Sequence, residues 1–339
     1  MIHRKRKRVL GTLDDRSILI TGGTGSFGRA FVRHILTHHR AKRLVVYSRD
    51  ELKQFEMANE VNAPNLRYFI GDVRDRGRLE RALNGIDTVV HAAAMKQVVA
   101  SEYNPIECIM TNVMGAENVI NACIDTDVKQ VVALSTDKAV NPINLYGASK
   151  LCSDKLFVAA NNIAGTNGCR FSVVRYGNVI GSRGSVVPVF RKQMATGKLC
   201  ITDPRMTRFW LTIDQGVRFV IRGLSMMQGG EVFVPKIPSM RIPDLATAMA
   251  PDCEQEITGI RPGEKLHEIM IPVDEARQTV EFDDFYIIRP DFHMWKPDNK
   301  YIYDGLTGAP VAEGFSYTSD GNDTWVNAEE LRTMIGTED

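Results

Sequence analysis

The sequence has no long hydrophobic run and few cysteines. No stretch approaches about 18 continuous apolar residues, and no apolar segment follows the basic start of the chain, so neither a membrane span nor a signal peptide is expected. The six cysteines include no CxxC pair, and no histidine and cysteine cluster has metal-ligand spacing. We therefore expect a cytoplasmic protein whose cysteines are free thiols and which holds no metal.

The sequence also lacks an excess of charge of one sign, because its formal net charge is +1. Five basic residues lie at positions 4–8 in MIHRKRKR, and without them 37 lysines and arginines face 41 acidic residues. A like-charged run at a terminus is typical of a solvated, mobile arm, although contact with a membrane or a nucleic acid stays open for it. For the protein as a whole we expect no nucleic acid and no membrane as a partner.

Short β-branched runs alternate with longer amphipathic segments from Ser17 to about Val179. This alternation predicts an α/β fold with a Rossmann-like, doubly wound parallel sheet, whose ligands bind at the carboxyl ends of the strands. Beyond Ser182, proline, glycine and short mixed elements dominate, which indicates a smaller lobe over the substrate. The predicted organisation is a basic arm over 1–16, an NADP-binding domain over 17–182, a mainly substrate-binding lobe over 183–281 that is interleaved with the sheet, and a surface-packing segment over 282–339.

A glycine-rich turn, TGGTGSFGRAF, follows the first predicted strand. Gly22 permits a tight turn, Gly25 lets backbone N–H groups approach a pyrophosphate, and Gly28 allows the following helix to pack closely on the strand. A glycine pattern alone is weak evidence, but its place between a strand and a helix predicts a dinucleotide site.

The end of the second predicted strand, YSRDELK, indicates which dinucleotide binds. An NAD-binding fold usually places an acidic residue here, on the adenosine ribose. Ser48 and Arg49 stand at the strand end instead, and Lys53 follows one helical turn later, which favours the 2′-phosphate of NADP. Asp50 leaves NAD open as the alternative cofactor, and Arg49 alternatively only solvates the end of the strand.

Other residues are expected to line the cofactor site because they stand in the glycine-rich turn or at strand ends. Asp72 and Val73, after the third strand, are placed to bracket the adenine, and Ala92 and Ala93 offer a wall of small side chains after the fourth. The remaining candidates are Thr21, Thr24, Ser26, Phe27, Lys96, Leu134, Ser135 and Val179.

The stretch LSTDKAVNPINLYGASK carries the candidate catalytic groups. Tyr146 and Lys150 are four residues apart, so both project from one face of a helix. A tyrosine acts as a base only if its pKa falls from about 10 towards 7, which requires roughly 4 kcal/mol of phenolate stabilisation. A lysine ammonium and a cationic nicotinamide ring within a few ångströms supply energy of that order. The alternative is an ordinary Tyr-Lys pair on a helix surface.

Asp137 and Lys138 form a second charged couple just upstream. If Tyr146 helps to oxidise a sugar hydroxyl to a ketone, the neighbouring C–H becomes acidic and a lysine can remove that proton. An adjacent carboxylic acid can then protonate a hydroxyl one carbon further on, so that it leaves as water. The alternative is a solvated ion pair in a loop.

Together these segments resemble the extended short-chain dehydrogenase/reductases and, more narrowly, the configuration-inverting UDP-N-acetylglucosamine 4,6-dehydratases of the pseudaminic acid pathway. The motifs that carry the resemblance are TGGTGSFG, YSRDELK, HAAAMKQV, LSTDKAVNPINLYGASK, VVRYGNVIGSRGSVVP, DPRMTRFW and RPGEKLHE. They run in order from about Ser17 to Asp274, and Asp-Lys stands where other sugar dehydratases have Asp-Glu.

The resemblance implies a role for each catalytic candidate. Tyr146 would deprotonate the C4 hydroxyl while hydride passes from C4 to NADP⁺, and Lys138 would take the C5 proton. Asp137 would protonate the departing 6-hydroxyl, and Thr136 would hold the sugar by a hydrogen bond. Hydride would return to C6, and reprotonation of C5 from the opposite face would give UDP-2-acetamido-2,6-dideoxy-β-L-arabino-hexos-4-ulose, so the reaction is a lyase step.

The resemblance also implies where UDP-N-acetylglucosamine binds and how the protein assembles. A UDP diphosphate needs compensating cations, which several arginines can supply. Members of the family tend to form homohexamers. The positions that match the family's substrate contacts are Lys96, Asn178, Arg183, Gly184, Ser185, Val186, Val187, Thr202, Arg205, Arg208, Arg261 and Glu264.

Three other functions stay open on the sequence. Configuration-retaining dehydratases share most of these motifs but commonly have methionine where Tyr146 stands. UDP-sugar 4-epimerases share the fold and the Tyr-Lys couple but lack the Asp-Lys pair, because nothing is eliminated. A non-catalytic NADP sensor on the same fold would be expected to lose Tyr146 or Lys150.

Overall fold

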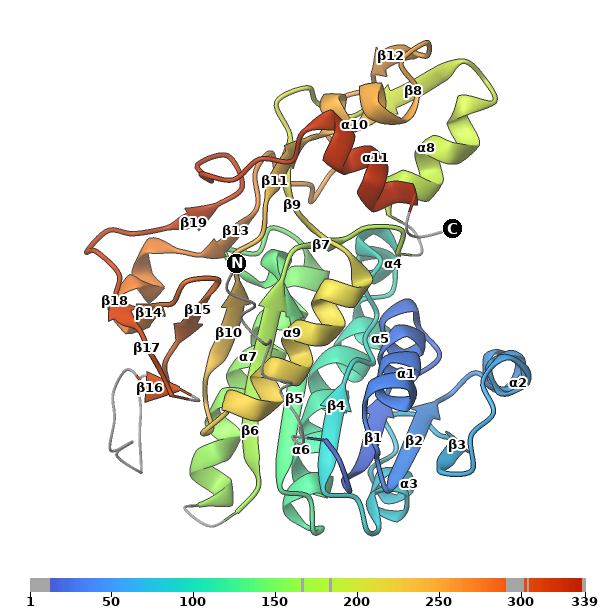
Figure 1. Cartoon of the computed structure of the whole chain (residues 1–339), viewed down its shortest axis with the longest axis vertical. Coiled ribbons are helices and arrows are strands. Elements are labelled where there is room, and N and C mark those ends of the chain that lie inside the picture. The colour runs from blue at the N-terminus through green and yellow to red at the C-terminus, as the bar shows by residue number, and fades with distance from the viewer. Residues whose placement is uncertain (1–12, 166–167, 183–184, 291–301, 304, 337–339) are drawn as a thin grey trace, which may run out of the picture.

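A ten-stranded sheet forms the centre of the computed structural model (Figure 1), which describes residues 13–165, 168–182, 185–290, 302–303 and 305–336. From β3 to β10, neighbouring strands pair in parallel in the order β3-β2-β1-β4-β5-β6-β10. The order reverses beside β1, which is the topological switch point where ligands bind in such sheets. These strands are β1 (Ser17–Thr21), β2 (Arg43–Ser48), β3 (Leu66–Ile70), β4 (Thr88–His91), β5 (Gln130–Thr136), β6 (Arg170–Tyr176) and β10 (Val232–Pro235).

The helices that connect these strands cover both faces of the sheet, so β1 and β4 are buried along their whole length, as continuous apolar strands of parallel sheets are. Helices α1 and α9 pack against each other, and α6 packs against both α3 and α7. The helices are α1 (Ser26–His38), α2 (Glu51–Glu60), α3 (Arg76–Leu83), α4 (Val98–Tyr103), α5 (Pro105–Ile109), α6 (Gly115–Ile124), α7 (Leu145–Ala164) and α9 (Ile213–Met226).

A smaller lobe stands over the carboxyl ends of the parallel strands, at the top of Figure 1. It has a hydrophobic core of its own, in which Phe190, Trp210, Leu245 and Leu331 are buried. A three-stranded sheet of β11, β9 and β7 joins the lobe to the strand ends. The elements of the lobe are β7 (Asn178–Val179), α8 (Val186–Met194), β8 (Lys198–Ile201), β9 (Thr207–Leu211), β11 (Ser239–Arg241), α10 (Ile242–Met249), β12 (Glu254–Ile257) and α11 (Ala328–Gly336).

The C-terminal part of the chain differs from the predicted surface-packing segment over 282–339. Strand β15 (Phe285–Ile288) is buried throughout and lies in the main sheet between β10 and β14 (Thr279–Glu281). Its four apolar residues pair antiparallel with β10 and cover the edge that β10 would otherwise expose. Leu331 of α11 is buried in the core of the smaller lobe. The remaining elements are β13 (Ile269–Ile271), β16 (Ile302–Tyr303), β17 (Leu306–Thr307), β18 (Ala309–Pro310) and β19 (Tyr317–Thr318).

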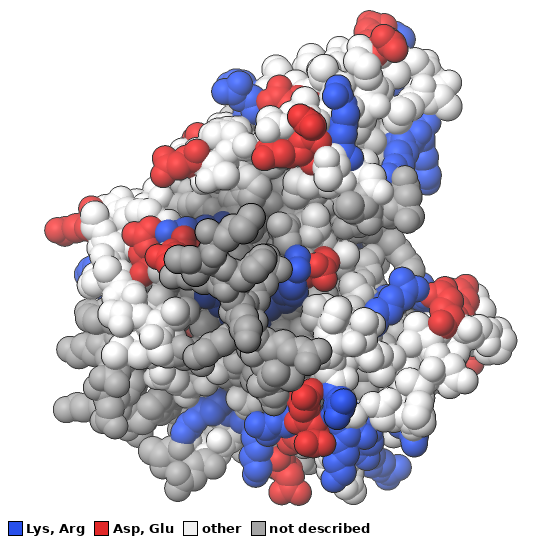
Figure 2. Space-filling model, in the orientation of Figure 1, with Lys and Arg blue, Asp and Glu red and all other residues white. Residues whose placement is uncertain are grey.

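Basic and acidic side chains are interspersed over the face seen in Figure 2. Within the described ranges no helix has the length and apolar character to cross a bilayer, and no three His, Cys, Asp or Glu side chains gather where a metal ion could be held. Most of the predicted basic arm lies outside the described residues.

Candidate active site

The glycine-rich turn joins β1 to α1 and is shaped to receive an anion. Gly22 has φ of 66°, and a Cβ there would lie 2.9 Å from the backbone of Ala93. A Cβ on Gly28 would lie 2.4 Å from the carbonyl oxygen of Gly23, so the helix approaches the turn as closely as glycine allows. Gly25 caps α1 without a side-chain hydrogen bond, which leaves N–H groups of the first turn available for a pyrophosphate. This turn fits a dinucleotide.

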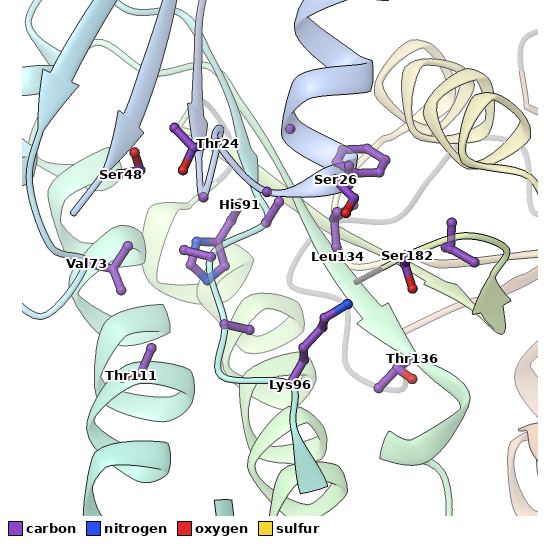
Figure 3. A pocket seen from close by; sticks show the side chains of 18 of the residues that line it. Thr24, Ser26, Ser48, Val73, His91, Lys96, Thr111, Leu134, Thr136 and Ser182 are labelled. Carbon is purple, nitrogen blue, oxygen red and sulfur yellow. The ribbon is translucent and has the colours of Figure 1, made fainter. Parts of the chain in front are cut away.

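A cavity of about 550 Å³ runs from this turn along the carboxyl ends of the strands (Figure 3). It brings together most of the predicted cofactor residues, which are Gly22, Thr24, Gly25, Ser26, Phe27, Gly28, Ser48, Arg49, Asp50, Lys53, Asp72, Val73, Ala92, Ala93, Lys96, Leu134, Ser135 and Val179. The cavity also contains Thr136, Lys138, Tyr146 and Lys150 from the catalytic stretch, and Asn178 from the predicted substrate set. One cavity therefore combines a dinucleotide cradle with proton-transferring groups.

The far end of the cavity carries the groups that bear on the choice of cofactor. Arg49 is 62% exposed, and its Nη1 lies 3.9 Å from Oδ2 of Asp72. Asp50 accepts a hydrogen bond from the backbone N–H of Lys53 at 3.0 Å, so it caps α2, and it also pairs with the Lys53 ammonium. The carboxylate that would bind a ribose hydroxyl is thus engaged by its own helix.

The loop after β4 is held by Asn112, which the sequence did not single out, and by Thr21. Asn112 lies in the π-helical turn between α5 and α6, accepts the N–H of Met95 at 2.8 Å and donates to the Met95 carbonyl at 2.9 Å. Thr21, predicted to line the cofactor site, does not line the cavity; its hydroxyl is 2.9 Å from Nδ1 of His91 and accepts the N–H groups of Ala92 and Ala93 at 3.2 Å. Figure 3 shows Lys96 extending from this loop towards Leu134 and Ser182.

Tyr146 and Lys150 stand in the first turns of α7, which Asn144 caps by accepting the N–H of Gly147 at 2.7 Å. Burial is the largest influence on Tyr146 and raises the pKa of its phenol to about 12, while the ammonium of Lys138 opposes this rise. A phenol whose pKa is raised in this way acts as a base near neutral pH only if further positive charge is close to it.

Lys150 has a buried counter-charge of its own on the next turn of α7. Burial lowers the pKa of the Lys150 ammonium, and the carboxylate of Asp154 partly offsets this effect. Asp154 accepts the hydroxyl of Ser135 at 2.6 Å, and Arg175 lies 3.9 Å behind it. These contacts hold the Asp154 carboxyl group, whose charge offsets the burial of Lys150.

Asp137 and Lys138 face inward at the end of β5, and they do not form a solvated ion pair. Nζ of Lys138 lies 3.0 Å from Oδ1 of Asp137 and 3.0 Å from Oε1 of Glu268. Asp137 is fully buried behind Lys138, and Thr136 donates to Oδ1 at 2.9 Å. Burial raises the pKa of the Asp137 carboxyl, and the nearby Glu268 carboxylate adds to this. The two carboxylates raise the pKa of the Lys138 ammonium despite its burial.

Of the three described arginines that were predicted to bind substrate from the smaller lobe, one is buried and two are exposed. Arg208 is buried on β9, with Nη2 3.7 Å from Glu264 and Nε 3.8 Å from Glu268. Arg261 is 68% exposed and pairs with Glu264 at 3.2 Å, and Arg205 is 67% exposed and pairs with Asp203 at 2.8 Å.

The other predicted contacts in this lobe lie near α8 or between β8 and β9. Ser185 precedes α8, Val186 packs partly buried on the core of the lobe, and Val187 is fully inside that core. The hydroxyl of Thr202 contacts Sδ of Met206 at 3.1 Å. Arg183 and Gly184 lie outside the described residues.

Sequence reasoning missed Glu268, Asp154 and Tyr176, all of which are buried beside the catalytic groups. Glu268 ends the motif RPGEKLHE, and the only sequence feature that pointed to this glutamate was its place at the end of a segment rich in charge. Asp154 follows Lys150 by one helical turn, which was a second signal. Tyr176 ends a buried strand and gave no signal that differs from that of a core residue.

The doubly wound sheet, the glycine cradle and the Tyr146–Lys150 pair define an extended short-chain dehydrogenase/reductase fold and site. The model of the polysaccharide biosynthesis protein family matches residues 18–290, and the chain belongs to this family. It is 56% identical over 324 residues to an inverting UDP-N-acetylglucosamine 4,6-dehydratase of Campylobacter jejuni, covering 94% of this chain and 97% of the relative. The resemblance found in the sequence is therefore confirmed.

Other relatives carry different names. A UDP-glucose 4-epimerase of Rickettsia conorii is 40% identical over 333 residues, covering 96% of each chain. Among solved structures, Pen from Bacillus thuringiensis has a TM-score of 0.86 and 36% identity and covers 96% of this chain and 98% of its own. The dTDP-glucose 4,6-dehydratase DesIV from Streptomyces venezuelae, with NAD bound, has a TM-score of 0.66 and 25% identity and covers 74% of this chain and 86% of its own.

Proposed function

We propose that this chain is an NADP-dependent, inverting UDP-N-acetylglucosamine 4,6-dehydratase. Its product would be UDP-2-acetamido-2,6-dideoxy-β-L-arabino-hexos-4-ulose, and the step would open pseudaminic acid biosynthesis. The observation that carries the proposal is the inward-facing pair of Asp137 and Lys138, joined at 3.0 Å. Lys138 lines the cofactor cavity together with Tyr146, and Asp137 is buried directly behind Lys138. A 56% identical relative named as an inverting dehydratase supports it.

Each reacting atom of the sugar has a matching group that lines the cavity or, in the case of Asp137, lies directly behind its wall. Tyr146 takes the proton of the C4 hydroxyl, with Lys150 below it on the same helix face. Lys138 takes the proton from C5, which the C4 ketone has made acidic, and Asp137 protonates the leaving oxygen on C6. Thr136, at the end of β5, holds the sugar through its hydroxyl. NADP, when bound, supplies the hydride acceptor for C4 and the hydride donor for C6.

The preference for NADP over NAD rests on Arg49 and on the engagement of Asp50. Arg49 is largely exposed at the cavity wall, where a guanidinium can bind a 2′-phosphate. Asp50 is occupied as the cap of α2, and an aspartate in that position is not free to bind a ribose diol. DesIV, the more distant relative, holds NAD, so this preference is a property to be measured on this chain.

The binding of UDP, the assembly and the location follow from the resemblance. Lys96 and Asn178 line the cavity, and we infer that the arginines of the smaller lobe, with Arg261 first among them, bind the UDP diphosphate. The inferred assembly is a homohexamer, and the inferred location is the cytoplasm, where UDP-sugars are made.

One experiment tests the reaction and its stereochemistry together. The purified protein is incubated with UDP-N-acetylglucosamine and NADP in D₂O, and the product is analysed by NMR. We expect a 4-keto-6-deoxy sugar with deuterium at C5 and L-arabino geometry, because a proton removed by Lys138 is replaced from solvent. A D-xylo product would instead assign the chain to the retaining dehydratases.

The same spectrum distinguishes the epimerase alternative that the Rickettsia relatives raise. An epimerase inverts C4 and leaves the hydroxyl on C6, so its product retains the C6 methylene signals and takes up no deuterium at C5. That result would refute elimination as the function of Asp137 and Lys138.

A further inference from the structure

Glu268 is a second carboxylate in contact with the catalytic lysine. Its Oε1 lies 3.0 Å from Nζ of Lys138, the same distance that separates Nζ from Oδ1 of Asp137. Glu268 is only 2% exposed and, like Asp137, does not line the cavity; it is in contact with Lys138, which does. The ammonium thus sits between two carboxylates, of which the proposed mechanism uses one.

The backbone of Glu268 is fixed by a segment far away in the sequence. The N–H of Glu268 donates to Oγ of Ser319 at 2.9 Å, and the N–H of Ser319 donates to the carbonyl of Glu268 at 2.8 Å. Oγ of Ser319 also lies 2.6 Å from the hydroxyl of Thr207 on β9. A buried carboxylate with this much backbone support is held in place before any substrate binds.

The charges around Glu268 favour its ionised form and the protonated form of its partner. Positive charges, that of Lys138 first, hold the pKa of the Glu268 carboxyl below its usual value in spite of burial. Glu268 in turn raises the pKa of both Lys138 and Asp137. The ionisable groups that face this cluster are Asp137 and Lys138 at the end of β5, Tyr146 on α7, Arg208 on β9, and Lys265 in the segment before Glu268.

We propose that Glu268 is a positioning residue that anchors Lys138 against Asp137 and keeps on this pair the one proton that the elimination uses and regenerates. The inference rests on the proposed dehydratase function. It assigns a part in the dehydratase reaction to a residue that does not touch the sugar and that lies outside the Asp-Lys motif.

The proton count of the elimination shows why one retained proton is sufficient. The reactive form has a neutral amine on Lys138 and a carboxylic acid on Asp137. When the C5–H bond breaks, Lys138 gains that proton, and when the C6–O bond breaks, Asp137 gives its proton to the leaving oxygen, which departs as water. Transfer of the proton from Nζ back to Oδ1, across 3.0 Å, restores the reactive form. A fixed anion at Glu268 prevents the pair from losing this proton to solvent as the pH rises.

The test compares wild type with Glu268→Gln and Glu268→Asp by measuring kcat for UDP-N-acetylglucosamine dehydration against pH. We expect the alkaline limb to move to lower pH by about one unit or more in Glu268→Gln, because removing a charge within hydrogen-bond distance shifts a buried group by that order. Glu268→Asp keeps the charge further from Nζ and is expected to move the limb less. KM is expected to stay within about threefold, since Glu268 is not in the cavity.

A second readout needs no turnover. In protein labelled with ¹³C at the lysine ε-carbons, the Lys138 signal, assigned by its absence in Lys138→Met, reports the protonation of its amine. Lys138 is expected to lose its proton at lower pH in Glu268→Gln than in wild type. Glu281→Gln removes a carboxylate that pairs with Lys236 at 2.7 Å on the outer strands and serves as the control without effect.

The kcat–pH profile and the Lys138 titration together distinguish a failure of the proposed dehydratase function from a failure of the positioning role of Glu268. If wild type makes no dehydrated sugar but the Lys138 titration still shifts in Glu268→Gln, the proposed function fails and the positioning role stands. If Glu268→Gln lowers kcat by the same factor at every pH and leaves the Lys138 titration unchanged, or if Glu268→Asp shifts the titration as much as Glu268→Gln, the positioning role is refuted.

Discussion

Replacing Lys138 by methionine is expected to abolish water loss and to destabilise the fold in a pH-dependent manner. Methionine keeps most of the length of the side chain but removes the ammonium that lies 3.0 Å from both Asp137 and Glu268. These carboxyls are 0% and 2% exposed, so water cannot replace the lost ammonium. The variant therefore has two buried carboxylates that repel each other.

The size of the effect follows from these two contacts. A hydrogen bond to a charged group contributes about 1.5–3 kcal/mol, and removing one partner of a buried ion pair costs about 3–5 kcal/mol. Because the Lys138 side chain is 25% exposed, we take about 3 kcal/mol at pH 8.5 as the expected loss. For a chain of 339 residues, with an unfolding entropy of about 2.1 cal/mol/K per residue, that loss lowers Tm by about 4 °C.

The sign of the pH dependence is set by the carboxyl groups. Without Lys138, the pKa values of Asp137 and Glu268 in the folded state rise above those in the unfolded state, so the folded state binds more protons. The variant then gains stability as the pH falls and loses it as the pH rises through the raised folded-state pKa values. We expect a loss of only about 1 kcal/mol at pH 5.5, since the carboxyls can protonate there.

Thermal melts at pH 8.5 and 5.5 and turnover of UDP-N-acetylglucosamine measure both effects. We expect turnover to fall by at least about 10², while NADP binding persists because the glycine cradle is untouched. Lys155→Met, an exposed position on the same α7 that carries Tyr146, is the matched control, with a stability change within about 0.5 kcal/mol. Equal destabilisation at the two pH values, or retained turnover, would refute the assignment of Lys138 as a buried base between two carboxyls.

Two further predictions concern the cofactor. Arg49→Asp should weaken NADP binding far more than NAD binding, because a carboxylate repels a 2′-phosphate and accepts from a ribose diol; fluorescence titration with both dinucleotides measures this, and equal effects on both would count against NADP. Gly28→Ala should reduce dinucleotide affinity by at least about tenfold and lower Tm, because its Cβ would lie 2.4 Å from the Gly23 carbonyl. Gly336→Ala, where a Cβ meets nothing within 4 Å, is the control, and unchanged affinity in Gly28→Ala would contradict the close helix approach.

The parts of the site that were predicted from the sequence are those carried by local pattern. Gly22 and Gly28 stand at a strand-to-helix turn, which fixes where a dinucleotide fits without knowledge of the rest of the chain. Tyr146 and Lys150 are one helical turn apart, so their shared face follows from helix geometry. The prediction of a surface-packing segment over 282–339 was wrong at β15, which is a buried strand of the main sheet. A run of four apolar residues has the same sequence pattern in a surface-packing segment and in a strand of the sheet.

The sequence by itself determined the order of strands and helices in the parallel sheet, the phosphate cradle and the candidates for proton transfer, because each of these depends on residues close together in the chain. Only the tertiary structure decided the protonation of those groups. Glu268 lies 130 positions after Lys138, yet its carboxylate is 3.0 Å from the ammonium. The pKa of a buried group depends on which charges surround it and how little water reaches it, and both are set by packing between distant segments.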